Sequence, residues 1–141
     1  MRWDFRLEES PGTPANDQPT FLRACEAFLL QGMAERRWTY WVAADDATLV
    51  SHIFIQRVPK VPKPNRIDDA FGYVTNVYTR PAYRNRGIGT QLMARVLGWA
   101  AEQDFESLIV WPSEASVPFY VRAGFQRSAD MLEYLVRPYV L

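Results

Sequence analysis

Arg84-Asn85-Arg86-Gly87-Ile88-Gly89 lies between an extended run, Gly72 to Thr79, and an amphipathic helix predicted from about Gly87 to Gln103. Two glycines spaced by one residue at a helix start let the backbone approach a ligand closely and leave several amide N–H groups unpaired. These donors and the positive end of the helix dipole favour an anion, and the arginines add positive charge beside the turn. The stretch predicts a site for a phosphate-bearing ligand, although a Gly-x-Gly after a strand is also often only a tight turn.

Two common phosphate loops do not match this stretch. The Walker loop requires Gly-Lys-Ser or Gly-Lys-Thr, which the sequence lacks, and the dinucleotide fingerprint requires a third glycine where Leu92 stands. The sequence therefore argues against ATP hydrolysis and against NAD binding.

The composition of the chain indicates a single soluble domain over residues 1–141. Its 141 residues are 48% hydrophobic, which is enough for one core, and Lys plus Arg and Asp plus Glu each number 16. A balanced charge gives no basic field for nucleic acid. Cys25 is the one cysteine, so no intrachain disulfide or multi-cysteine zinc site can form. With no signal-like or membrane-spanning run, we expect a cytoplasmic protein that binds no membrane, no nucleic acid and no metal.

The first half of the chain reads as helix, then hairpin. Residues 1–9 could be a short helix or a strand, and Asp17 is a plausible cap for a helix that runs to about Arg36. Its predicted apolar face consists of Phe21, Cys25, Phe28, Leu29 and Met33. Residues 38–44 and 48–58 are rich in β-formers and flank a short polar turn, so they predict an antiparallel hairpin. Residues 58–70 read as an exposed basic loop that either touches an anionic ligand or is merely solvated.

The second half predicts strand, helix, strand, helix and two closing strands. The strands are 71–79 and 107–111, with the helix of the phosphate turn between them, so these strands should be parallel. Residues 113–123 predict a short helix that becomes regular near Ser116 and ends at Gly124. Residues 125–128 and 132–137 are predicted as the closing strands. The expected fold is α+β, in three layers: a mixed, mostly antiparallel central sheet with helices on both faces.

With these segments placed, the chain resembles the GNAT superfamily of N-acetyltransferases, which transfer the acetyl group of acetyl-CoA to an amine. Residues 76–90 resemble the central strand and Arg/Gln-x-x-Gly-x-Gly/Ala pyrophosphate loop of that family. Residues 113–125, with Phe119-Tyr120 ahead of Gly124-Phe125, resemble its second motif. The 38–58 hairpin matches in pattern only. Together these segments cover roughly residues 20–137, and their order and spacing make the resemblance specific.

The resemblance implies acetyl-CoA as co-substrate and assigns roles by position. Backbone groups of Val77, Tyr78 and Thr79 would pair with the pantetheine arm, and the Val77 N–H would donate to the thioester oxygen. Tyr120 would protonate the departing thiolate, although tyrosines on such helices are often core residues. The remaining predicted cofactor-binding residues are Arg84, Asn85, Arg86, Gly87, Ile88, Gly89 and Thr90 in the pyrophosphate loop and Ser113 and Ser116 in the second motif.

The sequence departs from the family pattern at the position of the catalytic base. A glutamate that some relatives carry on the central strand corresponds to Tyr73 here. Proton loss through waters held by Tyr73, Thr75 and Asn76 is the favoured hypothesis, with Glu35, Glu114 and the only histidine, His52, as weaker candidates. Ser113 and Ser116 replace an asparagine and a small apolar residue of the family, and both keep a hydrogen-bonding side chain.

Residues 1–9 better resemble the first helix of the family, with its opening strand missing, so either the chain is truncated or a second subunit could supply an edge strand in a homodimer. The acceptor, a primary amine of a small molecule or peptide, is not specified by the sequence. Trp38, Tyr40, Trp41 and Phe54 would suit an organic amine, and core packing explains them equally well. The alternative function is a catalytically silent module that binds acyl-CoA as a sensor or interaction subunit.

Overall fold

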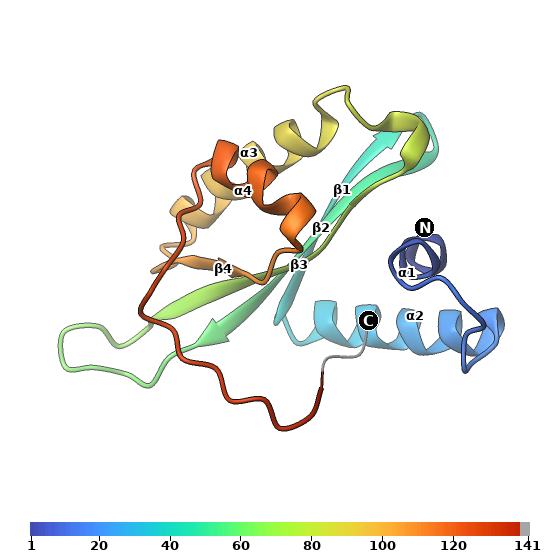
Figure 1. Cartoon of the computed structure of the whole chain (residues 1–141). Helices are drawn as coiled ribbons and strands as arrows, with labels where there is room; N and C mark the ends of the chain where they lie inside the picture. The colour runs from blue at the N-terminus through green and yellow to red at the C-terminus, as the bar shows by residue number, and fades with distance from the viewer. Residues whose placement is uncertain (139–141) are drawn as a thin grey trace.

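The computed structural model describes residues 1–138. Within them the sheet has the strand order β1-β2-β3-β4, with antiparallel β1–β2 and β2–β3 pairs and a parallel β3–β4 pair. Helices α1 and α2 lie on one face of the sheet, and α3 and α4 lie on the other (Figure 1). The predicted α+β fold with a mixed, mostly antiparallel sheet is confirmed. The elements are α1 (Arg2–Glu9), α2 (Gln18–Ala34), β1 (Trp38–Asp45), β2 (Thr48–Pro59), β3 (Ala70–Thr79), η1 (Pro81–Tyr83), α3 (Ile88–Glu102), β4 (Leu108–Val110), η2 (Glu114–Ser116) and α4 (Val117–Ala123).

The main core lies between the sheet and helices α3 and α4. Ile53, Ile55 and Val74 project from β2 and β3 against the apolar face of α3. That face is formed by Leu92, Met93, Val96 and Ala100, all buried. Gly87 caps α3 at φ 76°, a left-handed conformation that side chains other than glycine adopt at a cost. Because α3 packs on the sheet, its first turn has a fixed position. The same packing therefore positions the phosphate turn, residues 84–89, which leads into α3.

Helix α2 departs from the predicted apolar face. Asp17 caps it as expected, because its carboxylate accepts from the Thr20 N–H at 2.8 Å. Phe28 and Met33, however, are 52% and 59% exposed. The helix approaches β1 at Gly32, where an added Cβ would meet the side chains of Trp38 and Tyr40. Because the helix touches β1 along this narrow line, the side chains of α2 on either side of the line remain exposed to solvent.

The two predicted closing strands are wrong. From Phe125 to Pro138, the last residue described, the chain has no helix or strand. Apolar residues do alternate there as in a strand, yet Leu132, Tyr134 and Val136 are 97%, 89% and 88% exposed. A strand needs a neighbour for its backbone groups and a core for one face, and alternation alone supplies neither.

Strands β3 and β4 are paired only along the first half of β3, and this leaves space for a site beside its second half. Their last paired residues are Val74 and Val110, whereas β3 continues to Thr79. A β-bulge follows at once: His52 pairs with Tyr78 and Phe54 with Thr75, so two residues of β3 face Ile53. The first of the two, Asn76, has φ 54°. A bulge bends the strand and redirects its backbone groups, so the unpaired edge of β3 is turned at this point.

Candidate active site

The space beside the open edge of β3 is a cavity of about 840 Å³. Its walls come from α1, β3, the turn before α3, and the segment from the end of β4 to α4. All but one of the predicted site residues line it. They are Val77, Tyr78, Thr79, Arg84, Asn85, Gly87, Ile88, Gly89, Thr90, Ser113, Ser116 and Tyr120.

The turn before α3 presents free backbone donors to this cavity. No hydrogen bond within residues 1–138 uses the N–H groups of residues 85–90, and the first one onward, from Gln91, goes to the Gly87 carbonyl. A Cβ on Gly89 would lie 3.4 Å from Thr79 Oγ1 and 3.6 Å from the Phe119 ring. The glycine thus keeps the start of the helix close to β3 and α4. Unpaired donors at a helix start form an anion site.

Tyr120 of α4 is the predicted catalytic residue, and it lines the same cavity. Its side chain is 6% exposed, and its ring makes edge contacts with Phe119 and Phe125 at 5.1 and 5.4 Å between centroids. The hydroxyl has no hydrogen-bond partner among the described residues. Burial raises the pKa of Tyr120 to about 12, and the negative charge of Glu9 adds to that rise. The group is therefore a protonated, unpartnered donor at neutral pH.

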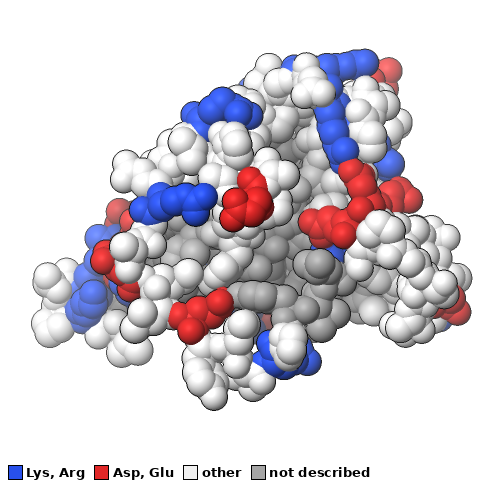
Figure 2. Space-filling view, viewed as in Figure 1, with Lys and Arg blue, Asp and Glu red and all other residues white. Residues whose placement is uncertain are grey.

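Helix α1 forms a wall that the sequence motifs did not reveal. Phe5, Arg6, Glu8 and Glu9 line the cavity. Glu8 bridges two groups of the cofactor motif: its Oε1 lies 2.6 Å from Arg84 Nη1, and its Oε2 accepts from the Tyr78 hydroxyl at 3.1 Å. The Arg84 guanidinium lowers the pKa of Glu8. In Figure 2 acidic side chains gather where α1 lies, next to basic side chains of the segment after β3.

Comparisons with known proteins agree with this geometry. The sequence profile of the acetyltransferase (GNAT) family matches residues 3–125. The chain belongs to the GNAT family. The predicted enzyme class, an acyltransferase, is confirmed with it. A search of the curated proteins found no match.

Solved structures with the fold of this GNAT acetyltransferase include three that illustrate its range. A predicted acetyltransferase from Clostridium acetobutylicum with acetyl-CoA is 23% identical, with a TM-score of 0.74 over 94% of this chain and 84% of that one. A GCN5-related N-acetyltransferase from Ralstonia eutropha is 26% identical, with a TM-score of 0.67 over 87% and 83%. Glucosamine-6-phosphate N-acetyltransferase from Arabidopsis thaliana is 14% identical, with a TM-score of 0.66 over 93% and 86%.

Arg86 is the predicted site residue that does not line the cavity of the acetyltransferase. Its guanidinium lies over the Tyr83 ring, 5.4 Å from the centroid. The serines of the second motif bond to each other, because Ser113 Oγ donates to Ser116 Oγ at 3.0 Å and Ser116 Oγ donates to the Ser113 carbonyl at 2.9 Å. They stabilise the 3-10 turn that leads into α4.

The candidate groups for proton removal separate clearly in space. Tyr73, Thr75 and Asn76 line the cavity, whereas Glu35, Glu114 and His52 do not. His52 is 2% exposed, and its Nδ1 is bonded to the Asn76 carbonyl of the bulge. Burial lowers the pKa of His52 to about 4, so the ring is neutral at pH 7. His52 thus stabilises the bulge through its hydrogen bond to the Asn76 carbonyl, and it does not line the cavity.

The aromatic side chains considered for the acceptor lie elsewhere. None of Trp38, Tyr40, Trp41 and Phe54 lines the cavity. Trp41 packs against Trp99 of α3, with ring centroids 5.8 Å apart. Among the aromatic pairs that do line the cavity is Tyr73 with Trp111, with ring centroids 5.1 Å apart. Neither of these two residues was predicted from the sequence as an aromatic contact for the acceptor.

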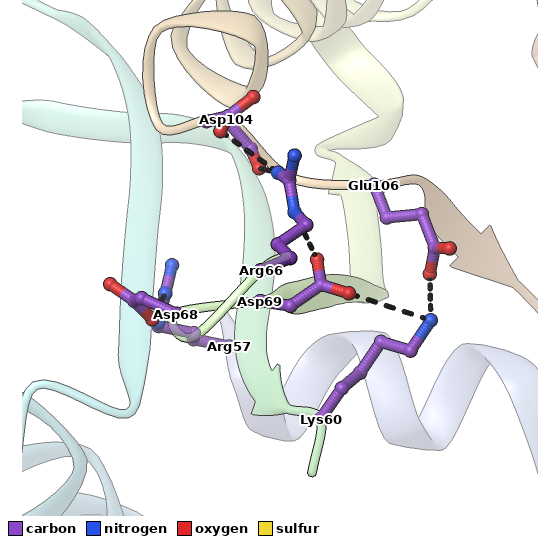
Figure 3. A network of polar contacts seen from close by, with 7 residues as sticks. All are labelled: Arg57, Lys60, Arg66, Asp68, Asp69, Asp104 and Glu106. Atoms are coloured by element: carbon purple, nitrogen blue, oxygen red, sulfur yellow. Dashed lines mark hydrogen bonds and ion pairs between the residues drawn. The ribbon is translucent and has the colours of Figure 1, made fainter. Parts of the chain in front are cut away.

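The basic loop between β2 and β3 is tied to carboxylates outside the cavity. Asp69, 3% exposed, lies between Arg66 at 2.9 Å and Lys60 at 3.7 Å (Figure 3). Arg66 also reaches Asp104 at 2.8 Å, and Lys60 pairs with Glu106, so the loop is joined to the turn between α3 and β4. Burial opposes ionisation of Asp69, but these cations outweigh it and lower the pKa of Asp69. Lys60 and Arg66 of the loop therefore have carboxylate partners of their own.

No helix in residues 1–138 has the length and apolar character needed to cross a membrane.

Proposed function

We propose that this chain transfers the acetyl group of acetyl-CoA to a primary amine of a small molecule or peptide by direct attack, with Tyr120 as the general acid. One observation carries the proposal. In a chain of the GNAT family, an open β3 edge, a turn of unpaired amides and a buried protonated tyrosine line a single cavity. We further propose that the enzyme acts in the cytoplasm, and that a homodimer is one form it can take.

The residues present fit acetyl-CoA. The amides of residues 85–90 are free to hold the pyrophosphate, and Arg86 would take part through its backbone because its side chain lies over Tyr83. The edge of β3 at Val77, Tyr78 and Thr79 has no strand beside it, so the pantetheine amides can pair there as an added strand. Ser113 and Ser116 line the same cavity on the α4 side.

Three tasks define the chemistry. The amine must be neutral when it attacks, because an ammonium has no lone pair. The N–H of Val77, the second residue of the bulge, would donate to the thioester oxygen as negative charge builds on it. Tyr120 would then give its proton to the sulfur as the C–S bond breaks. A phenol that stays protonated up to about pH 12 is available for that transfer across the physiological range.

Calorimetry with acetyl-CoA and an assay of CoA thiol release with a panel of primary amines test the proposal. The panel should include tryptamine, spermidine, amino sugars and lysine peptides. We expect acetyl-CoA to bind and at least one amine to be acetylated. Binding without thiol release from any amine would instead support the silent acyl-CoA-binding module, and absence of binding would contradict both.

A further inference from the structure

The acidic side chains that line the cavity, within residues 1–138, are Glu8 and Glu9. Glu8 is engaged on both oxygens, by Arg84 and by the Tyr78 hydroxyl. Glu35 and Glu114 lie outside the cavity, and His52 is buried beneath the bulge. Tyr73, Thr75 and Asn76 can orient water, but none of them carries a carboxylate or an imidazole. Glu9 is therefore the carboxylate available to an amine in the cavity.

Glu9 lines the cavity, and its side chain is 45% exposed. It is the last residue of α1, and its Oε2 pairs with Arg6 Nη1 one turn earlier. Burial lowers the pKa of Arg2 on the same helix, and the negative charge of Glu9 partly opposes that shift. From the other wall, α4 presents Tyr120 and Arg122. Arg6 holds the carboxylate in place, while the exposed side of the group remains open to solvent and to a ligand.

Tyr120 gives an independent indication that a ligand belongs between these walls. It is a polar side chain more than nine-tenths buried, it lines the cavity, and its hydroxyl has no partner among the described residues. Glu9 lines the same cavity as Tyr120, so one bound ligand can meet both groups. The negative charge of Glu9 also contributes to the raised pKa of Tyr120.

We propose that Glu9 is a catalytic residue that binds the acceptor as an ammonium ion and takes its proton. This inference rests on the proposed acetyl transfer. The nitrogen gives one proton to the Glu9 carboxylate, and its lone pair forms the bond to the carbonyl carbon. As the C–S bond breaks, the sulfur takes the Tyr120 proton and the nitrogen gives up its second proton to restore Tyr120. Glu9 releases the first proton to solvent, so the net products are the amide, CoA thiol and one proton.

Four variants test this role with the best amine of the panel. We expect Glu9→Gln to lower kcat/KM for the amine by about 100-fold while acetyl-CoA affinity is unchanged, since general base catalysis contributes 10²–10⁴-fold. Glu9→Asp should keep part of the rate. Glu9→Ala should be slow, and added formate should restore its activity, which a purely structural defect would not allow. Glu114→Gln, a glutamate outside the cavity, should match the wild type.

The outcomes separate the two proposals. A wild type that turns over together with Glu9→Gln at the wild-type rate, or Glu9→Ala that formate does not revive, overturns the role of Glu9 alone. A wild type that binds acetyl-CoA and acetylates no amine overturns the proposed function, and the role of Glu9 with it.

Discussion

Tyr120 combines a structural role with the chemical role proposed for it, and a single substitution separates the two. Its ring belongs to the core cluster, and its hydroxyl faces the cavity without a partner among the described residues. Tyr120→Phe keeps the ring, so we expect folding and acetyl-CoA affinity to be retained while kcat falls by about 100-fold. Steady-state kinetics and calorimetry measure the two quantities. Tyr134→Phe, at a tyrosine that is 89% exposed, is the control and should leave both unchanged. An unaltered kcat in Tyr120→Phe would remove this residue from the mechanism.

If Arg84 binds the cofactor as proposed, Glu8 competes with the cofactor for it. A carboxylate 2.6 Å from the guanidinium offers the same kind of partner as a phosphate, so acetyl-CoA binds against that ion pair. Glu8→Gln removes the charge and keeps an oxygen that can accept from Tyr78. We therefore expect a dissociation constant for acetyl-CoA about two- to five-fold lower, in line with the worth of exposed ion pairs. Calorimetry at low and moderate salt measures it. Weaker binding in this variant would show instead that Glu8 positions Arg84 for the cofactor.

At the level of single residues, the sequence predicted those cavity-lining residues that belong to local motifs. The glycines and amides of the phosphate turn and Tyr120 lie in short motifs whose spacing is tied to one helix start or one helix face. Glu8 and Glu9 could not be found this way, because their place in the cavity depends on how α1 packs across β3. Phe5 makes that contact, with its ring 4.7 Å from that of Tyr78. Such a contact spans more than seventy residues of chain and leaves no pattern in either segment.

At the level of elements, His52 links β2 to the bulge of β3 and carries a titration that affects folding. Its pKa is about 4 in the folded protein and near 6.5 when exposed. The unfolded chain therefore binds more protons between these values, and the protein loses stability as pH falls from about 6.5 towards 4. We expect the free energy of unfolding to drop by about 2 kcal/mol between pH 7 and pH 5 from this group. Urea denaturation at the two pH values measures it.

His52→Gln is the matched variant for that experiment, since glutamine can donate to the Asn76 carbonyl and does not titrate. Because the chain contains one histidine, the difference between the two pH dependences reports on this residue. Equal losses of stability in the wild type and in His52→Gln would show that the ring is not kept neutral by the fold.

The elements predicted correctly are those whose own sequence contains a signal for the start, a hydrophobic periodicity and a signal for the end. Helix α3 and helix α4 have glycine at a boundary in the left-handed region, and the β1–β2 hairpin turns at Asp46, also left-handed. The closing strands failed because alternation at Leu132, Tyr134 and Val136 says nothing about whether a partner edge is in reach. The predicted apolar face of α2 was partly wrong for the same reason, because its burial depends on contact with another element. Gly32 sets the distance of α2 from the sheet.

At the level of the whole molecule, the β3–β4 pair is closed at one end and open at the other. The Gly72 N–H donates to the Ser107 carbonyl and the Glu106 N–H to the Ala70 carbonyl, both at 2.9 Å, where the strands start. The ionic network of Figure 3 surrounds this closed end and joins the β2–β3 loop to the turn before β4. The cavity opens beyond Val74 and Val110. The ionic network and the proposed binding site thus lie at opposite ends of one strand pair.

Asp69 is the centre of the closed end, and its neighbour provides an internal control. Asp69→Asn leaves Arg66 and Lys60 without their shared, buried carboxylate, so we expect the melting temperature to fall by about 5 °C or more. Asp68→Asn removes a carboxylate that is 88% exposed and pairs with Arg57, and it should change the melting temperature little. Calorimetric melting curves compare the two variants. Neither residue lines the cavity, so acetyl-CoA affinity at 25 °C should stay at the wild-type value in both. A loss of affinity in Asp69→Asn without loss of stability would mean that the closed end sets the width of the opening, and that the two ends are not independent.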